Sequence, residues 1–542
     1  MPTPPPFHRP TALDRLAQEP FDVLVIGGGI TGCGVAFDAA TRGLKTALVE
    51  RGDFAAGTSS KSSKMVHGGL RYLQQKEIGL VYEALHERQL LLKNAPHLVT
   101  LIPFLIPNVT KDGILNPKLA RALGIALWLY DLTGGIRTGK LHKRISKAKT
   151  LEMLPMLEPD RVASGYLYYD ATADDARLTL TVARSAAEAG AAVANYCAVT
   201  ELLTDDAGAV IGARVDSGGR MIDIHAKVVV NAAGVWSDQI RTMAEPEAPE
   251  TMRPAKGIHI AVPWEKVRNT CAAAIPVGDG RSIFIIRWDD VAYSGTTDTE
   301  YDGPLDNPQC TAADIDYLLA ALNRVHTETF TRADVLGSWA GLRPLLAGDG
   351  HSTKTADLSR GHKVRTSNST LITITGGKLT TYRRMASDTV DAVCGLLGRK
   401  ARCVTKRRPL SGAVDPTRLT TKGLSPHLAH RYGRAGESVA ALTADPEMAL
   451  PLVPGLAYLR AEAIHAVRHE MARTLDDVLT RRTRARLLDA DATWQAAPSV
   501  AELIAPELGW DTTRVNAEIQ SVRASIAADQ EHAGLPPVGN PA

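Results

Sequence analysis

Two stretches near the start of the chain carry residue types that hold phosphate groups. The first is the glycine motif 27–32, Gly-Gly-Gly-Ile-Thr-Gly, between the apolar run 23–26 and a helical stretch. In a G-x-G-x-x-G spacing the glycines permit a tight turn, close approach of backbone to a pyrophosphate, and packing of helix on strand. The free N–H groups at the start of the helix then point at the phosphates. The pattern predicts a dinucleotide-binding turn.

A second strand, residues 45–49, ends at Glu50, which lies about 20 residues past the turn, where a carboxylate can accept hydrogen bonds from an adenosine ribose. An acid at this position argues against a 2′-phosphate. This unit alone does not decide whether the dinucleotide is NAD or FAD. The cofactor-binding residues predicted from it are Gly27, Gly29, Ile30, Thr31, Gly32 and Glu50.

The second stretch, residues 51–72, is unusually rich in glycine and in small hydroxyl residues. Hydroxyl groups donate to phosphate or ribityl oxygens, and adjacent glycines let backbone lie against a flat ring. The stretch therefore predicts a loop wrapped around a dinucleotide. The residues expected to contact the cofactor are Thr58, Ser59, Ser60, Ser63, Lys64, His67, Gly68, Gly69 and Leu70.

Near residue 376 an apolar strand runs into Gly376-Gly377, followed by a helix that begins near Lys378. Such a helix directs its positive N-terminal end at an acceptor, which suits the N1 and C2 carbonyl edge of a reduced flavin. A nicotinamide ring needs no positive helix end beside it, so the cofactor is expected to be FAD. The residues expected beside it are Gly377, Lys378, Leu379 and Thr380.

The run Gly57 to Tyr72, joined to the glycine turn, resembles the FAD-dependent glycerol-3-phosphate dehydrogenases of the D-amino-acid-oxidase-like flavoprotein group. Further matching stretches extend the resemblance over roughly residues 20 to 490. It implies an α/β fold with a Rossmann-like FAD domain, an antiparallel-sheet substrate domain and a helical C-terminal domain. It also implies that Ala233 and Gly234, at the end of the strand from Val228, pass beside the cofactor.

The resemblance implies a cluster of cations for a phosphorylated substrate. Arg343, Arg360 and Lys378 match the positions that bind glycerol phosphate in the family, and Arg71 matches a cation close to the site. Guanidinium groups grip phosphate through two parallel hydrogen bonds, which makes arginine the expected residue type. Tyr72 is a further candidate for orienting the substrate.

His259 is the candidate proton acceptor, because imidazole titrates near neutral pH and the matching family histidine lies near the substrate. The family usually has serine where this chain has Ile258, which puts the surroundings of His259 in question. The residues expected to act in catalysis are His259, Arg343 and Lys378.

The predicted reaction is oxidation of sn-glycerol 3-phosphate to dihydroxyacetone phosphate, with the electrons passed to a membrane quinone. Two alternatives stay open from the sequence. One is an oxidase that returns the electrons to dioxygen, and the other is a flavin-bound scaffold without catalysis. A homodimer is a further expectation.

Charge, cysteine spacing and the N-terminal sequence indicate which partners, bound metals and cell compartment to expect. The 542 residues include 62 Lys and Arg against 59 Asp and Glu, and a net charge of +3 predicts no bulk affinity for nucleic acid. The six cysteines lack C-x-x-C spacing, so no metal site or disulfide framework is expected. The N-terminus lacks the apolar core of a signal peptide, and a reducing cytoplasm fits best.

The changes in character along the chain predict four parts. They are an N-terminal tail at 1–20, an FAD-binding domain at 21–405 interleaved with a substrate domain at 96–170 and 250–365, a helical domain at 406–529, and a flexible tail at 530–542. In the helical domain an apolar stripe that includes Ile464 and Leu475 is most simply core packing, and the arginines 481, 482, 484 and 486 flank it.

An apolar helix predicted over 119–132 precedes the stretch 137–149, which contains cations and no acid. It is too short to span a bilayer, which takes about 20 apolar residues. Burial of Leu123, Leu127 and Trp128, with the cations, would anchor a peripheral protein on the anionic inner face of the cell membrane. A buried core helix followed by a solvated loop is the open alternative.

Overall fold

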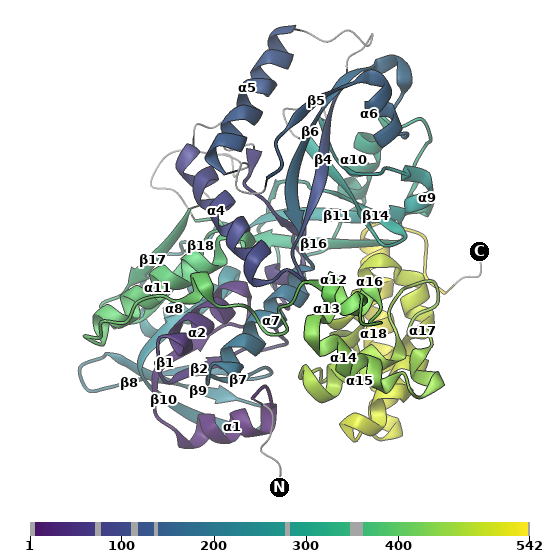
Figure 1. Ribbon diagram of the computed structural model, residues 1–542. Helices are drawn as coiled ribbons and strands as arrows, with labels where there is room; N and C mark the ends of the chain where they lie inside the picture. The colour runs from purple at the N-terminus through teal and green to yellow at the C-terminus, as the bar shows by residue number, and fades with distance from the viewer. Residues whose placement is uncertain are drawn as a thin grey trace.

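The computed structural model describes residues 6–70, 77–109, 117–134, 139–276, 282–346 and 361–539. These residues form two β-sheets, followed along the chain by a body of helices drawn in green to yellow in Figure 1. The expected α/β class, with a second sheet and a helical C-terminal region, is confirmed.

The first sheet has the strand order β17-β18-β10-β1-β2-β7, with β9 paired to β10 and β8 to β9. Its central strands are parallel, and β1 is buried along its whole length, which explains its unbroken apolar run. Its strands are β1 (Phe21–Ile26), β2 (Thr46–Val49), β7 (Ala192–Ala194), β8 (Ala198–Thr204), β9 (Val210–Asp216), β10 (Met221–Asn231), β17 (His362–Thr366) and β18 (Ile372–Gly376).

Helices α2 (Ile30–Thr41), α7 (Asp175–Glu188) and α11 (Tyr382–Leu396) cover one face of this sheet (Figure 1). On the other face lies α1 (Arg9–Gln18), where only an N-terminal tail was expected. That expectation is wrong for residues 9–18. A proline opens the helix in its first turn, where its missing N–H costs nothing, and Leu13 and Leu16 enter the core.

The second sheet has the order β15-β11-β14-β13-β12-β4-β6-β3, with β16 paired to β11 and β5 to β6. In the antiparallel pair of β11 and β16, His259 lies opposite Trp339 and Ala255 opposite Arg343. Its strands are β3 (Met65–Val66), β4 (Thr100–Val109), β5 (Lys143–Ser146), β6 (Val162–Thr172), β11 (Ala255–Pro263), β12 (Ala272–Pro276), β13 (Ser282–Trp288), β14 (Val291–Gly295), β15 (Thr299–Glu300) and β16 (Gly337–Arg343).

Several helices pack around the two sheets. They are α4 (Ile78–Asn94), α5 (Pro117–Thr133), α6 (Lys147–Met153), α8 (Ser237–Ala244), α9 (Trp264–Val267) and α10 (Ala312–Asn323). Tyr130 and Leu127 of α5 are buried with Leu85 of α4 against the second sheet. Helices α4 and α5 are therefore fixed to the sheet by one face, and the other face points outward.

The C-terminal body is built of helices, with the predicted apolar stripe at its core, where Leu475, Val478 and Leu479 are fully buried. The interpretation of that stripe as core packing is confirmed. Its elements are α12 (Pro416–Thr420), α13 (Pro426–Tyr432), α14 (Gly436–Leu442), α15 (Arg460–His469), a π-helix (Asp477–Arg482), α16 (Ala485–Leu488), α17 (Ala490–Leu508) and α18 (Thr512–His532).

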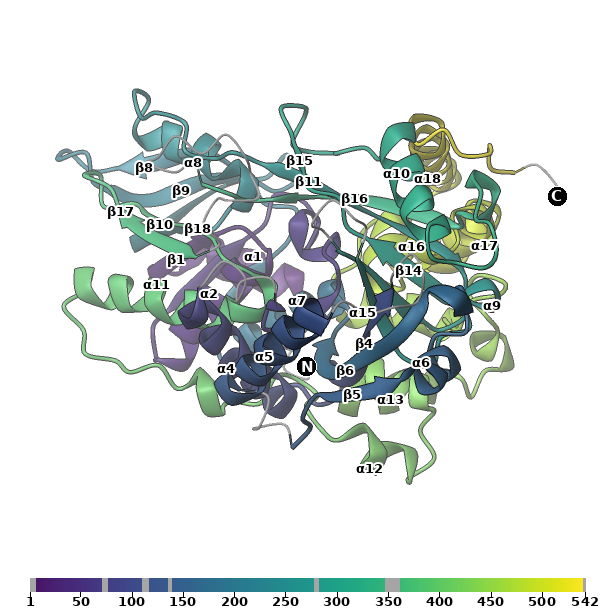
Figure 2. The ribbon, with the colours of Figure 1, turned by 90° about the horizontal axis from the view of Figure 1, so that it is seen from above.

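The segment after α18 is packed where a flexible tail was expected from residue 530. Ala533 and Leu535 are buried in the core of the second sheet, next to α10. Helices α10 and α18 overlap in the view of Figure 2, and the contact is at the end of α18, where a Cβ on Gly534 would lie 3.0 Å from Ala312 Cβ. The prediction rested on glycine and proline content, which does not reveal two apolar side chains that fill an existing core.

Candidate functional site

The glycine turn between β1 and α2 has the geometry that its spacing predicts. Gly27 has φ +115°, and a Cβ there would lie 2.6 Å from the carbonyl oxygen of Ala232. A Cβ on Gly32 would lie 1.9 Å from the carbonyl oxygen of Gly27. Glycine is therefore required at both positions. The Glu50 carboxylate at the end of β2 accepts hydrogen bonds from the backbone N–H of Gly28 (2.6 Å) and Gly52 (2.9 Å).

A cavity of about 500 Å³ runs from this turn toward the second sheet. Its wall includes the turn, Glu50, the segment 56–59, the segment 232–236 and the segment 376–379. Burial raises the pKa of Glu50 in this wall. The cavity therefore offers backbone donors at one end and a carboxylate beside them, as an adenosine diphosphate group requires.

A smaller cavity of about 190 Å³ adjoins the first, and both are lined by Thr58, Ser59 and the segment 376–379. The small cavity also has His259, Arg343 and Lys378 in its wall. The three residues that were expected to act in catalysis therefore face one space, which continues into the long cavity. This is the arrangement needed to hold a small substrate against one end of a dinucleotide.

His259 on β11 is held on two sides. Its Nε2 lies 2.9 Å from Ser63 Oγ, and its ring stacks on Trp339 with centroids 5.0 Å apart and planes 10° apart. Burial, followed by the charges of Lys64 and Arg343, keeps the pKa of His259 well below its usual value. The imidazole is therefore uncharged. Ile258 lies in the apolar core, with the alternation that a strand imposes, so its bulk does not line the cavity.

Arg343 ends β16 and is oriented before any ligand arrives. Its Nη1 lies 3.1 Å from Asp298 Oδ1, and its Nη2 donates to the carbonyl of Thr297 at 3.0 Å. A Cβ on Gly257 of the neighbouring strand would lie 2.4 Å from Nη2, so glycine makes room for the guanidinium. The position of this cation is fixed by the sheet and by its acceptors.

Lys378 follows two glycines with positive φ, Gly376 (+75°) and Gly377 (+82°), and it lines both cavities. A turn of 3₁₀ helix (Leu379–Thr381) separates it from α11, so the α-helix begins four residues later than expected. The turn is tied to the cofactor loop, since Thr380 Oγ1 accepts from the backbone N–H of His67 at 3.1 Å.

Most of the predicted cofactor residues line these two cavities. They are Gly27, Gly29, Ile30, Thr31, Glu50, Thr58, Ser59, Ser63, His67, Ala233, Gly234, Gly377, Lys378, Leu379 and Thr380. Others do not line either cavity, namely Gly32, Ser60, Lys64, Gly68, Gly69 and Leu70. Lys64, for example, bonds to Asp175 and to the Ser60 carbonyl. The predicted substrate residues Arg71, Tyr72 and Arg360 lie outside the described residues.

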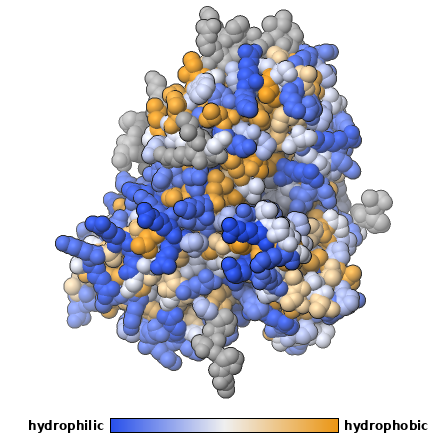
Figure 3. All heavy atoms as spheres, in the orientation of Figure 1, coloured by the Kyte–Doolittle hydropathy of each residue, from blue (hydrophilic) through white to orange (hydrophobic). Residues whose placement is uncertain are grey.

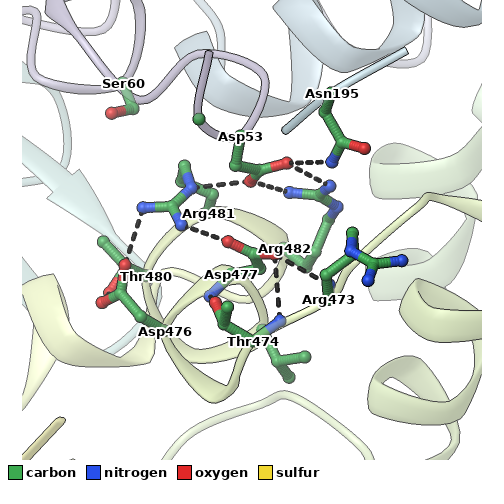
Figure 4. A network of polar contacts seen from close by, with 12 residues as sticks. Asp53, Ser60, Asn195, Arg473, Thr474, Asp476, Asp477, Thr480, Arg481 and Arg482 are labelled. Carbon is green, nitrogen blue, oxygen red and sulfur yellow. Dashed lines mark hydrogen bonds and ion pairs between the residues drawn. The ribbon is translucent and has the colours of Figure 1, made fainter. Parts of the chain in front are cut away.

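The reverse side of the cofactor loop meets a buried group of charges that the motifs did not reveal (Figure 4). Asp53 accepts from Arg481 Nε at 2.7 Å and from Arg482 Nη1 at 2.6 Å. Arg484 donates to the Ser60 carbonyl and, at 3.0 Å, to Asp175 Oδ1. The C-terminal body thus holds the loop from behind.

Burial alone would raise the pKa of Asp53, but the charges of Arg482 and Arg481 outweigh it and lower the pKa. The carboxylate is therefore ionised and its burial depends on the two arginines. One signal in the sequence pointed here: arginines beside a fully buried stripe must be paired. Nothing local identifies an acid more than 400 residues away as the partner.

Two family models match the chain. Residues 22–383 match the family described as FAD dependent oxidoreductase, and residues 403–515 match the C-terminal domain of alpha-glycerophosphate oxidase. Residues 384–402, between the two matches, hold most of α11 and the start of the connection to the helical body.

Named relatives match over most of their length. Glycerol-3-phosphate dehydrogenase 2 of Mycobacterium tuberculosis (strain ATCC 25618 / H37Rv) is 41% identical, over 97% of this chain and 91% of the relative. The mitochondrial glycerol-3-phosphate dehydrogenase of Mus musculus is 38% identical, over 95% of this chain and 74% of its own.

Solved structures agree. The glycerol-3-phosphate dehydrogenase from Bacillus halodurans complexed with FAD aligns with a TM-score of 0.78 at 30% identity, over 96% of this chain and 97% of that one. L-alpha-Glycerophosphate Oxidase from Mycoplasma pneumoniae has a TM-score of 0.55 at 18% identity, over 71% of this chain and 97% of that one, and so shares the fold.

Proposed function

Because the chain belongs to the FAD-dependent oxidoreductase family and carries the C-terminal domain of alpha-glycerophosphate oxidase, we propose that it is an FAD-dependent glycerol-3-phosphate dehydrogenase. It oxidises sn-glycerol 3-phosphate to dihydroxyacetone phosphate by hydride transfer to FAD and passes the electrons to a membrane quinone. Relatives that carry this dehydrogenase name cover nearly the whole chain.

The observation that carries the proposal is the wall of the small cavity, where a neutral imidazole and two cations face one space beside the dinucleotide site. Arg343 and Lys378 hold the phosphate of the substrate, since clustered cations are the groups that bind a phosphate monoester. His259 accepts the proton of the secondary hydroxyl, because its imidazole is uncharged and is oriented by Ser63 and Trp339.

The residues of the long cavity fit FAD. The glycine turn and the N-terminus of α2 suit the pyrophosphate, Glu50 suits the adenosine ribose, and the segment 376–379 borders the space for the ring system. When bound, FAD supplies the hydride acceptor. The small cavity fixes which carbon of the substrate meets it, because the phosphate and the hydroxyl are held by different side chains.

An anaerobic titration with glycerol 3-phosphate, followed by flavin absorbance, tests cofactor and substrate together. We expect full bleaching by glycerol 3-phosphate and none by glycerol, which lacks the phosphate that Arg343 and Lys378 hold. Persistence of the oxidised spectrum with both compounds would overturn the proposed reaction. With a quinone analogue turnover should exceed peroxide formation in air, and the reverse would make the protein an oxidase.

We also propose that the outward face of α4 and α5 lies on an anionic membrane, where the quinone is found. Apolar side chains gather there (Figure 3), and Ile125, Trp128, Leu129 and Leu132 of α5 are exposed. This corrects the expected face, since Leu127 is buried and Leu123 is partly buried in the core. In the described residues no helix is long and apolar enough to cross a bilayer.

Cations that follow α5 in the sequence would add electrostatic attraction to the anionic lipid. Lys140 just before β5, Lys143 and Arg144 on β5, and Lys147 at the start of α6 are exposed. Each basic residue near an anionic surface contributes about 1 kcal/mol. We expect sedimentation with anionic liposomes at low salt, partial release as salt rises, and weaker binding to neutral liposomes.

Two variants test the membrane face. Replacing those four cations with glutamine should weaken sedimentation, and Leu129→Ser with Leu132→Ser should weaken it independently of salt. Activity with a soluble dye acceptor should stay intact in both. Unchanged sedimentation in the two variants would place the membrane surface elsewhere.

A further inference from the structure

A third cavity, of about 420 Å³, lies where the two sheets meet the C-terminal body. Its wall comes from the start of α7, the turn between β13 and β14, and α13, and Figure 1 shows α7 and α13 near the centre of the molecule. It shares no lining residue with the two cavities described above. The proposed reaction therefore leaves this cavity without a role.

The deep wall of the cavity contains two fixed guanidinium groups. Arg177 pairs with Glu470 and donates to the Arg482 carbonyl at 2.8 Å. Arg431 Nη1 lies 3.2 Å from Asp174 Oδ2, and its Nη2 also donates to the Arg482 carbonyl. These bonds hold both cations in place, and the ordering of a long side chain is already accomplished before a ligand arrives.

Donors remain unused in this wall. Among the described residues, His97 Nδ1 and Arg177 Nε have no hydrogen-bond partner, and each of the two residues is only 2% exposed. Burial and the nearby charges of Arg177 and His430 lower the pKa of His97 to about 4, so the ring is neutral and one nitrogen carries a proton. Arg177 Nε is a donor, and a buried donor without an acceptor is rare in folded proteins and points to an absent acceptor.

The rim adds charge at the entrance. Arg287 and His430 are exposed there, and Asp289 is the exposed acid of the rim. The other lining acid, Asp174, is already occupied by Arg431 and Arg484. Leu98 and Trp288 supply an apolar side.

We propose that this cavity is an effector site for a small organic oxyanion, a phosphate or carboxylate compound of the size of a few carbon atoms. The anionic group accepts from Arg177 Nε and from the protonated nitrogen of His97, and it is attracted by Arg431 and Arg287. The carbon skeleton lies against Trp288 and Leu98.

The site is connected to the substrate cavity through the segment 60–64. Lys64 and Tyr293 line the effector cavity, and Tyr293 donates from its hydroxyl to the Ser63 carbonyl at 3.1 Å. Ser63 Oγ in turn contacts His259 Nε2 at 2.9 Å. An occupant that shifts Lys64 or Tyr293 therefore changes the surroundings of the proton acceptor.

Binding is tested by calorimetric titration of the FAD-loaded protein with inorganic pyrophosphate in phosphate-free buffer. We expect saturable binding that weakens about tenfold or more in Arg287→Glu and in His430→Glu, because each puts a like charge at the entrance. Arg365→Glu is the matched control, since Arg365 is exposed on β17, outside all three cavities. Absence of saturable binding, or binding in Arg287→Glu equal to that in Arg365→Glu, would overturn the site.

The effector role rests on the proposed function and is measured separately, as the KM for glycerol 3-phosphate with and without pyrophosphate. A shift of about fivefold or more is expected in wild type and in Arg365→Glu, and it should be lost in Arg287→Glu. If pyrophosphate binds but the KM shift is equal in Arg287→Glu, the effector role is wrong. If glycerol 3-phosphate does not reduce the flavin, the proposed function fails while the titration still decides the site.

Discussion

The two sides of the segment 52–64 are built from different chemistry. The side that faces the cavities presents mainly backbone and neutral hydroxyl groups, such as Thr58, Ser59 and Ser63, with Lys61 as a charged side chain among them. The side that faces the C-terminal body presents a carboxylate, Asp53, and the Ser60 carbonyl to buried arginines. Neutral donors suit a ligand that must enter and leave, whereas buried ion pairs fix a loop that must not move.

The difference predicts unequal sensitivity to mutation. Loss of one partner of a buried ion pair leaves the other charged group unpaired, whereas loss of a neutral hydrogen bond has a small net effect. The same loop should therefore tolerate changes on its cavity side better than changes on its reverse side, although only the former touches the cofactor.

The largest effect is expected for Asp53→Ala, which removes the carboxylate that Arg482 bonds and one of the three carboxylates around Arg481. The free energy of unfolding should fall by about 3–5 kcal/mol, and FAD should be released at lower temperature. Thermal unfolding followed by flavin fluorescence measures both. Arg468→Gln is the control, because its pair with Glu507 is half-exposed and contributes about 1 kcal/mol or less. Equal melting of the two variants would contradict the distinction between the sides.

Arg343→Ala tests a charged residue that faces the same cavity from β16. It should raise the KM for glycerol 3-phosphate by about 30- to 5,000-fold, which corresponds to about 2–5 kcal/mol, while FAD stays bound. Arg343→Lys should recover part of the affinity, since it keeps the charge and loses the fork. Steady-state kinetics and flavin content of the purified variants decide it. Normal turnover of glycerol 3-phosphate would remove Arg343 from the substrate site.

The motifs predicted the glycine turn and Glu50 because the relation between these residues is encoded locally. The turn 27–32, Glu50 and the loop after it lie within one strand-helix-strand unit, so spacing alone fixes their relation. The position of His259 was predicted through the resemblance, and its environment was not. The isoleucine at position 258 put the surroundings of His259 in question. The alternation of side chains along β11 places Ile258 in the core instead.

The reverse side was not predictable in the same way, because its partners are far apart in sequence. Arg484 and Asp175 are separated by 309 residues, and both look like ordinary surface charges in a sequence. Lys64 was predicted to contact the cofactor because it belongs to the loop that was expected to wrap around the dinucleotide. In the structure it lines neither cofactor cavity and bonds to Asp175. Composition likewise concealed α1 and the packed segment after α18.

The two sides also differ in how burial and neighbouring charges shift the pKa of a carboxylate. Burial raises the pKa of Glu50 on the cavity side, whereas on the reverse side the charges of Arg177, His465 and Arg184 outweigh burial and lower the pKa of Glu470 to about 2. A carboxylate with a lowered pKa in the folded state stabilises the fold above its ordinary pKa of about 4.5, and the stabilisation is lost as pH falls through that range toward 2.

The midpoint of thermal unfolding should therefore fall as pH drops below about 4.5, where the unfolded chain takes up protons that the folded Glu470 does not. Glu470→Gln should lower stability at neutral pH and flatten the acid slope. Differential scanning fluorimetry across pH measures the slope. An unchanged slope in the variant would assign acid sensitivity to other groups.

The smallest effect is expected for Ser59→Ala on the cavity side. Ser59 Oγ accepts from the backbone N–H of Ile30 at 2.9 Å and so ties the loop to the glycine turn. Its loss should weaken FAD binding by about 1 kcal/mol, or about fivefold. Equilibrium dialysis of FAD measures the change, with Ser438→Ala on an exposed helix as the control. A loss as large as that in Asp53→Ala would mean that the two sides do not differ.

The contact between Asp53 and Arg481 spans 428 residues of chain. At a synthesis rate of about 5–20 residues per second, the ribosome needs about 20–90 s to deliver the arginine after the aspartate has emerged. Throughout that interval the nucleotide unit exists without the charges that hold its loop. FAD capture is therefore expected to follow completion of the C-terminal body, and chains that end before residue 481 should remain colourless and dependent on chaperones.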